Sequence, residues 1–163
     1  MRKFIVSMLL LVCATGAFAQ FEKNKWFVNP SLTGLDWSYN KDRKMHFGFE
    51  AKGGAFVVDN FALLLHIGGD YGKHQDDVTT LGVGGRYYLD NIGLYFGLGL
   101  GYNYYDARIG KSYGDFGADF ELGYAFFLNR SITIEPGFYY NQSFNHHRDH
   151  SRFGLKVGFG VYF

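Results

Sequence analysis

The last twelve residues of the chain, RFGLKVGFGVYF (residues 152–163), alternate strictly between two kinds of side chain. Phe, Leu, Val, Phe, Val and Phe occupy one set of alternate positions, whereas Arg, Gly, Lys, Gly, Gly and Tyr occupy the other. Because successive side chains of a β-strand point to opposite faces, this stretch predicts a strand with one apolar and one polar face. The apolar face continues to Phe163, the last residue of the sequence.

The same period of two recurs along most of the chain and predicts seven further strands. The eight predicted strands cover approximately residues 26–35, 46–57, 61–71, 81–88, 94–103, 116–126, 131–143 and 152–163. The first is the least regular, because Pro30 has no N–H to donate and therefore suggests a bulge or a frayed start.

Two kinds of connection separate these strands. Three short turns at residues 58–61, 89–92 and 128–131 contain Asn or Asp and follow one another at intervals of 31 and 39 residues, which marks repeated hairpins. The longer connections, at residues 36–44, 72–78, 106–114 and 144–151, collect Lys, Arg, Asp, His and Gly. Short turns on one side and longer loops on the other are typical of an up-and-down membrane barrel, whose longer loops face the cell exterior.

The amino terminus has the features of a secretory signal peptide. Arg2 and Lys3 precede an apolar stretch from Phe4 to Val12, and Ala17-Phe18-Ala19 supplies an A-x-A cleavage site. We therefore expect residues 1–19 to be removed and residues 20–163 to form one domain. Cleavage would remove the only cysteine, Cys13, and leave 14 basic against 15 acidic residues, a balance that gives no electrostatic support for nucleic acid as a partner.

The period of two does not by itself show which face of the barrel is inside. A soluble lipocalin-like carrier, with its apolar face around a small ligand, is the alternative on location. Three features favour a transmembrane barrel: most glycines lie on the polar face, the strands are about nine to eleven residues long as a tilted crossing requires, and the chain stops on a strand-final Phe. We therefore predict an all-β, eight-stranded antiparallel up-and-down transmembrane β-barrel, whose closure leaves no unpaired backbone edge in lipid.

With its signal peptide, eight alternating strands and terminal Phe163, the whole chain resembles the small outer-membrane β-barrels of the OmpA/OmpX type, in the porin family of Gram-negative bacteria. The resemblance implies a monomer in the outer membrane, with the lipid bilayer and lipopolysaccharide as neighbours. It also implies that Phe163 is the signal read by the outer-membrane assembly machinery. We expect no periplasmic peptidoglycan-binding domain of the kind that OmpA carries.

The polar face of the predicted barrel carries charged residues that should meet in its interior. Counted from the short turns, Arg86 should lie lower in the barrel and Asp70, Asp119 and Arg152 higher. The other six should form a belt near mid-height: Glu50, Lys52, His66, Glu121, Glu135 and Lys156. Because buried charge is costly unless it is paired, we expect a structural network of salt bridges rather than a wide pore. A gated ion or proton path is the alternative. The predicted network comprises Glu50, Lys52, His66, Asp70, Arg86, Asp119, Glu121, Glu135, Arg152 and Lys156.

The sequence assigns no catalytic residue, cofactor or metal ligand. The loop NHHRDHS (residues 145–151) holds His146, His147 and His150 beside an acid and a hydroxyl, but neighbouring loop residues do not easily adopt the geometry of a hydrolytic triad. A surface metal site there and an outer-leaflet lipid A-modifying enzyme remain alternatives. We therefore predict a structural or surface-interaction role in the cell envelope, with an unidentified loop ligand and no enzymatic step.

Overall fold

Nine β-strands make up a computed structural model that describes residues 21–35, 47–71, 77–89, 92–106, 112–144 and 152–163. The side chains at positions 34, 35, 47, 70, 71 and 152 lie outside this description. The strands are β1 (Trp26–Leu35), β2 (Phe47–Val58), β3 (Phe61–Tyr71), β4 (Asp77–Tyr88), β5 (Leu94–Asp106), β6 (Tyr113–Tyr124), β7 (Phe126–Phe127), β8 (Ile132–Ser143) and β9 (Arg152–Tyr162).

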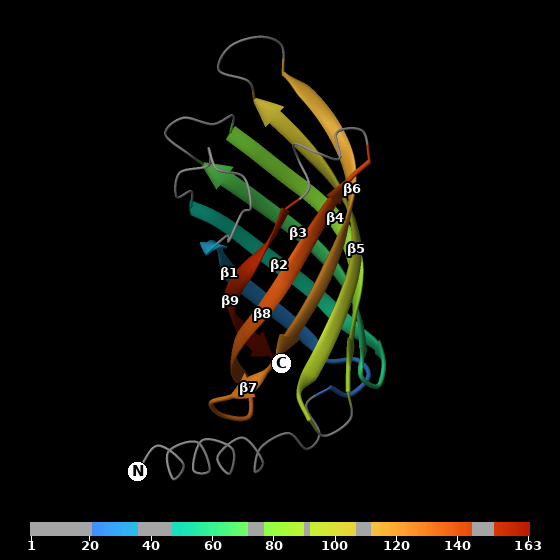
Figure 1. Cartoon of the computed structure of the whole chain (residues 1–163). Coiled ribbons are helices and arrows are strands. Elements are labelled where there is room, and N and C mark those ends of the chain that lie inside the picture. Colours follow the sequence, from blue (N-terminus) through green and yellow to red (C-terminus); the bar gives the residue numbers. More distant parts are fainter. Residues whose placement is uncertain (1–20, 36–46, 72–76, 90–91, 107–111, 145–151) are drawn as a thin grey trace, which may run out of the picture.

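The strands form one closed antiparallel barrel (Figure 1). Neighbouring strands pair in the order β6-β5-β4-β3-β2-β1-β9-β8, and pairing of β6 with β8 completes the ring. β7 is a two-residue continuation of β6 beyond Ala125 and pairs with the same strand, β8. The prediction of an eight-stranded up-and-down barrel is therefore confirmed.

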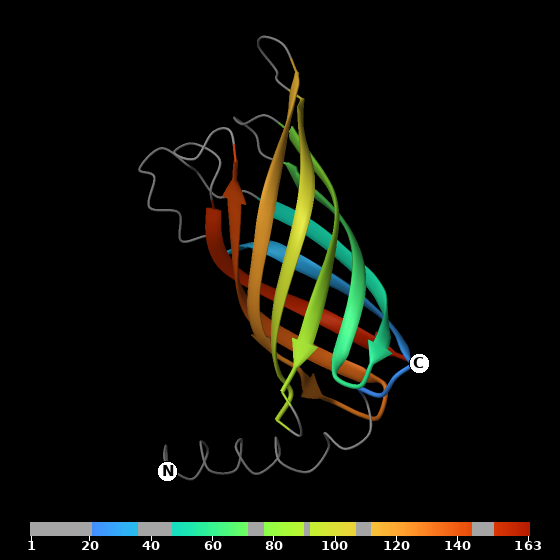
Figure 2. The same ribbon diagram turned by 90° about the vertical axis from the view of Figure 1, so that its right-hand side faces the viewer.

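The short turns and the carboxyl terminus lie at the same end of the barrel. The β2–β3 turn, β7 and the end of β9 gather there, at the bottom of Figures 1 and 2, and Phe163 exchanges backbone hydrogen bonds with Trp26 across the junction of β9 and β1. At the opposite end, β5 and β6 reach beyond the other strands (Figure 2). We call these the turn end and the loop end.

The apolar faces of the strands point outward. In β3, Leu63, Leu65 and Ile67 are each more than half exposed, whereas Leu64 and His66 between them are buried. The same alternation continues along β5, where Leu98 and Leu100 face out. This arrangement, with charged residues inside and leucines outside, is opposite to that of a soluble ligand-carrying barrel.

The first strand is more regular at its proline than the sequence suggests. Pro30 pairs with Ala51 in an uninterrupted register with β2. The irregularity lies further along, between Thr33 and Leu35, where the register with β9 shifts. Within the described part of the chain, no helix has the length and apolar character needed to cross a bilayer.

Candidate functional site: the barrel lumen

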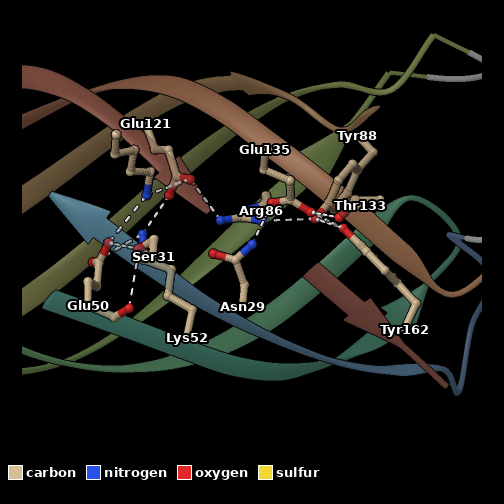
Figure 3. A network of polar contacts seen from close by, with 11 residues as sticks. Asn29, Ser31, Glu50, Lys52, Arg86, Tyr88, Glu121, Thr133, Glu135 and Tyr162 are labelled. Carbon is tan, nitrogen blue, oxygen red and sulfur yellow. Dashed lines mark hydrogen bonds and ion pairs between the residues drawn. The ribbon is translucent and has the colours of Figure 1, made fainter. Parts of the chain in front are cut away.

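Glu121 on β6 is the centre of the charged lumen (Figure 3). Its Oε2 lies 2.5 Å from the ammonium of Lys52 on β2. Its Oε1 lies 2.7 Å from a guanidinium nitrogen of Arg86 on β4 and 2.8 Å from the ammonium of Lys156 on β9. One carboxylate therefore draws together three cations from strands that lie on different sides of the barrel.

Glu50 on β2 shares two of these cations. Its carboxylate lies 3.4 Å from the Lys52 ammonium and 3.3 Å from the Lys156 ammonium. The hydroxyl of Ser31 donates to the same carboxylate from β1. The two lysines are thus held between two carboxylates, an arrangement in which each charge has more than one partner.

Glu50, Lys52, Glu121 and Lys156 form the belt that the structure shows. Arg86 links this belt to a second polar layer nearer the turn end. The guanidinium donates to Glu121 on one side and, at 2.8 Å, to Glu135 of β8 on the other. Glu135 also accepts hydrogen bonds from Asn29, Thr133 and Tyr162, at 2.9, 2.7 and 2.6 Å. The carboxylate of Glu135 is therefore saturated with donors, as Figure 3 shows.

Aromatic rings surround Arg86 below the belt. Its guanidinium carbon lies 4.1 Å from the centre of the Tyr95 ring and 5.5 Å from that of Phe27, within the range of cation–π contacts. The Tyr88 hydroxyl accepts a hydrogen bond from the guanidinium and pairs with the Tyr162 hydroxyl at 3.0 Å. A fully buried cation is thereby compensated by two carboxylates and by π-systems, which the low dielectric of an interior requires.

The turn end of the lumen is filled by a cluster of aromatic side chains. Its central member is Phe21, which precedes β1 and stacks on Tyr88 with ring centroids 4.0 Å apart. The Phe21 carbonyl accepts a hydrogen bond from the N–H of Asn60 in the β2–β3 turn. The buried rings of this cluster are Phe21, Phe27, Phe56, Tyr88, Tyr95 and Tyr162, with Phe127 packed against them.

The loop end of the lumen is more open. A cavity of about 110 Å³ lies on the loop-end side of the belt, and its lining includes Glu50, Lys52, His66 and Asp119. His66 Nε2 lies 3.2 Å from Asp119 Oδ2, and Asn141 donates to Asp119 Oδ1 at 2.5 Å. This cavity exceeds the roughly 10–15 Å³ that one water molecule needs, so we expect it to be hydrated.

The structure brings together most of the predicted interior residues. Glu50, Lys52, Arg86, Glu121, Glu135 and Lys156 form one connected network, while His66 and Asp119 form a separate pair. The side chains of Asp70 and Arg152 and the loop histidines His146, His147 and His150 lie outside the described residues. Phe163 lies on the outer surface, with 68% of its area exposed.

Sequence reasoning did not identify several partners in this network. Tyr88 and Tyr162 stand on the inward phase of their strands, which is the signal that could have identified them. Asn29 was hidden by the irregular pattern of the first strand. Phe21 lies before any strand, so no periodicity could have marked it.

No protein-family model matches the chain, and no curated protein matches it significantly. Solved structures do. The N-terminal β-barrel domain of Pseudomonas aeruginosa OprF superposes with a TM-score of 0.66 at 12% identity, covering 86% of this chain and 98% of that domain. Neisserial surface protein A gives a TM-score of 0.64 at 14% identity, over 84% of this chain and 95% of that one.

A third similar structure is the Yersinia pestis outer membrane protein Ail in a phospholipid bilayer nanodisc. It gives a TM-score of 0.55 at 12% identity, covering 87% of this chain and all of that one. At identities of 12–14%, these similarities show the shared fold alone. The chain therefore has the fold of the small eight-stranded outer-membrane β-barrels, as the OmpA/OmpX resemblance predicted.

Proposed function

We propose that the protein is a monomeric, non-enzymatic resident of the outer membrane that serves the cell envelope through its structure and its surface loops. Residues 1–19 would be removed as a signal peptide, leaving residues 20–163 as the barrel, and Phe163 would be the residue recognised during assembly. The single observation that carries the proposal is the combination of an apolar outer face with a lumen filled by paired charges and aromatic rings.

The outer face supports a membrane location. Leu65, Leu81 and Leu98 are each more than half exposed on neighbouring strands β3, β4 and β5. Such a continuous apolar band is costly in water, whereas it matches the outward-facing band of membrane barrels. The closed ring of paired strands also fits the membrane interior, where an unpaired backbone N–H or C=O group is costly.

The lumen argues against a transport or carrier role. Below the hydrated cavity, Glu121, Arg86 and Glu135 span the interior, and the rings around Phe21 fill the space beneath them. A wide diffusion path would need both layers to separate. An apolar ligand would have to displace paired charges, which costs several kcal/mol per uncompensated ion.

Interaction through the loop end is supported by aromatic side chains on its outer surface. Tyr102 and Tyr104 of β5 and Phe116 of β6 are exposed within a few residues of the loop ends of these strands. Amphipathic aromatic rings favour the membrane–water boundary, where lipopolysaccharide headgroups would contact them. Ail, one of the proteins of similar fold, is named the attachment invasion locus protein.

Cysteine labelling in whole cells tests the location and the orientation together. Ser112→Cys places a thiol at the loop end and Arg130→Cys places one at the turn end; both native side chains are exposed. The only native cysteine, Cys13, lies in the segment proposed to be removed.

A membrane-impermeant maleimide should label Ser112→Cys in intact cells and Arg130→Cys only after the outer membrane is permeabilised. Equal labelling of both in intact cells would contradict the orientation. Recovery of the protein in the soluble periplasmic fraction would contradict the location.

A deletion strain tests the envelope role. It should be more sensitive to detergent and large antibiotics than the parent strain, and expression of the wild-type protein should restore resistance. An unchanged deletion strain would contradict the envelope role.

A further inference from the structure

His66 lies in a trough made by glycines on the inner wall of the barrel. In the sheet register, His66 of β3 stands beside Gly82 of β4, which stands beside Gly101 of β5 and then Gly117 of β6. A Cβ at Gly82 would collide with the His66 ring at Nε2, so the imidazole lies directly over this glycine. The absence of side chains along this row lets His66 reach across two strands toward β6.

Asp119 of β6 meets the imidazole at the end of this trough. Asp119 Oδ1 is held by the Asn141 amide, and Oδ2 lies 3.2 Å from His66 Nε2. Despite this short distance, the buried Oδ2 atom takes part in no hydrogen bond with the residues that the structure describes. His66 Nε2 and Asp119 Oδ2 therefore lie close enough together to contact one and the same small ion.

The space for such an atom is present. A Cβ added to Gly101 would lie 3.2 Å from Asp119 Oδ2 and 3.4 Å from His66 Nε2, so the missing side chain leaves room beside both atoms. His66 and Asp119 also line the cavity of about 110 Å³. That cavity has room for water molecules to complete a coordination shell.

The geometry points to a divalent transition-metal site, and we propose that His66 Nε2 and Asp119 Oδ2 bind Zn²⁺ in the lumen. Zinc is coordinated by imidazole and carboxylate at about 2.0–2.2 Å, so two ligands of a tetrahedral ion are separated by roughly 3.4 Å. The observed 3.2 Å is close to that separation. Asn141 fixes the carboxylate from outside the coordination sphere, a supporting contact that tunes metal sites.

The site relies on two protein ligands. Among the residues that the structure describes, no group of three or more His, Cys, Asp and Glu side chains is placed to hold an ion, so water must supply the remaining positions. Electrostatics favours a cation at this position. Lys52, Arg86 and Lys156 pair with Glu50, Glu121 or Glu135, and in the described part of the chain His66 is the only basic side chain within ion-pair distance of Asp119.

Zinc binding to the full mature chain, folded in detergent micelles without a histidine tag, tests this proposal. A parent variant first replaces the five other histidines, His46, His74, His146, His147 and His150, with Ala, which leaves His66 as the only imidazole. Titration calorimetry should show one saturable Zn²⁺ per chain. Mg²⁺ at the same concentrations should not bind, because it prefers oxygen ligands and retains its water.

Variants of the parent then locate the ion. His66→Gln and Asp119→Asn should each weaken zinc binding at least tenfold, and Gly101→Ala should do the same by filling the space beside both ligands. Gly68→Ala is the matched control, because its Cβ would make only ordinary contacts, the nearest at 3.4 Å, on the same inner wall. Heat-dependent mobility in SDS gels verifies that each variant is folded. The proposal is overturned if the parent takes up no saturable zinc, if uptake survives His66→Gln or Asp119→Asn, or if Gly68→Ala abolishes it.

Discussion

Glu121 contacts three cations, so among the lumen carboxylates that the structure describes its removal leaves the most uncompensated charge. Glu121→Ala leaves Lys52, Arg86 and Lys156 with fewer partners in a buried position. Breaking a buried ion pair in this way costs about 3–5 kcal/mol. Urea unfolding of the barrel in lipid vesicles, followed by tryptophan fluorescence, should therefore show a lower midpoint.

The matched control is Glu22→Ala. Glu22 pairs with Lys25 at 3.7 Å, but its side chain is more than half exposed, so the substitution should change stability by at most about 1 kcal/mol. Equal unfolding midpoints for Glu121→Ala and the wild-type protein would contradict the account of the lumen as a paired-charge network.

The sequence predicts which charged side chains face the lumen but not which of them pair. The alternation of side chains indicated that Glu121 and Lys156 face inward, because inward and outward positions differ only in parity along a strand. The pairing partners depend on the strand tilt and on side-chain length, which parity does not contain. The sequence places Arg86 lower than the other charges but does not show that its long side chain contacts both Glu121 and Glu135.

At the scale of a strand, the outward face of β5 tests which side of the sheet meets lipid. Leu98 is more than half exposed among other outward apolar residues. Leu98→Arg should cost about 2–4 kcal/mol near the bilayer centre. We expect less folded protein in the outer-membrane fraction and a lower unfolding midpoint.

The same substitution at Leu128 supplies the control. Leu128 is similarly exposed but lies in the β7–β8 turn, where a charge remains in water. Leu128→Arg should be tolerated. If Leu98→Arg were tolerated equally well, the assignment of the outward face to lipid would be wrong.

The segment before β1 is an element in its own right, because it closes the turn end. Phe21 packs on Tyr88, Phe56 and Tyr162, so Phe21→Ala should leave a cavity and cost about 3 kcal/mol, the lower part of the range for such truncations. Its exposed neighbour Lys23 provides the control, since Lys23→Ala keeps the backbone hydrogen bond to Asp59. Indistinguishable thermal unfolding of the two variants would show that Phe21 does not stabilise the barrel.

The strands and their phase were predictable, whereas this closing segment was not. Period-two patterns reflect the two environments on either side of a sheet, and β1 begins at Trp26 as expected. The residues before it are held by turn contacts, such as the Asn24 N–H bonding to the Phe56 carbonyl. Such contacts depend on the assembled barrel and leave no periodic signal in the sequence.

The charged network and the aromatic cluster together obstruct the lumen, so we expect the barrel to conduct no steady current. Arg86 and its carboxylates span the lumen, and the aromatic cluster fills the turn end beneath them. The purified protein in a planar bilayer should show no long-lived open state. Discrete conductance steps that disappear after substitution of Lys52 or Glu121 would instead support the ion-path alternative.

Gel mobility of the outer-membrane fraction tests whether the protein forms a closed barrel in that membrane. Cells expressing the protein are fractionated, and the outer-membrane fraction is run in SDS with and without boiling. A closed, fully hydrogen-bonded barrel should resist SDS until heated, so the band should change its mobility on boiling. A band in the soluble periplasmic fraction with no such shift would contradict the account and would direct attention to small apolar ligands.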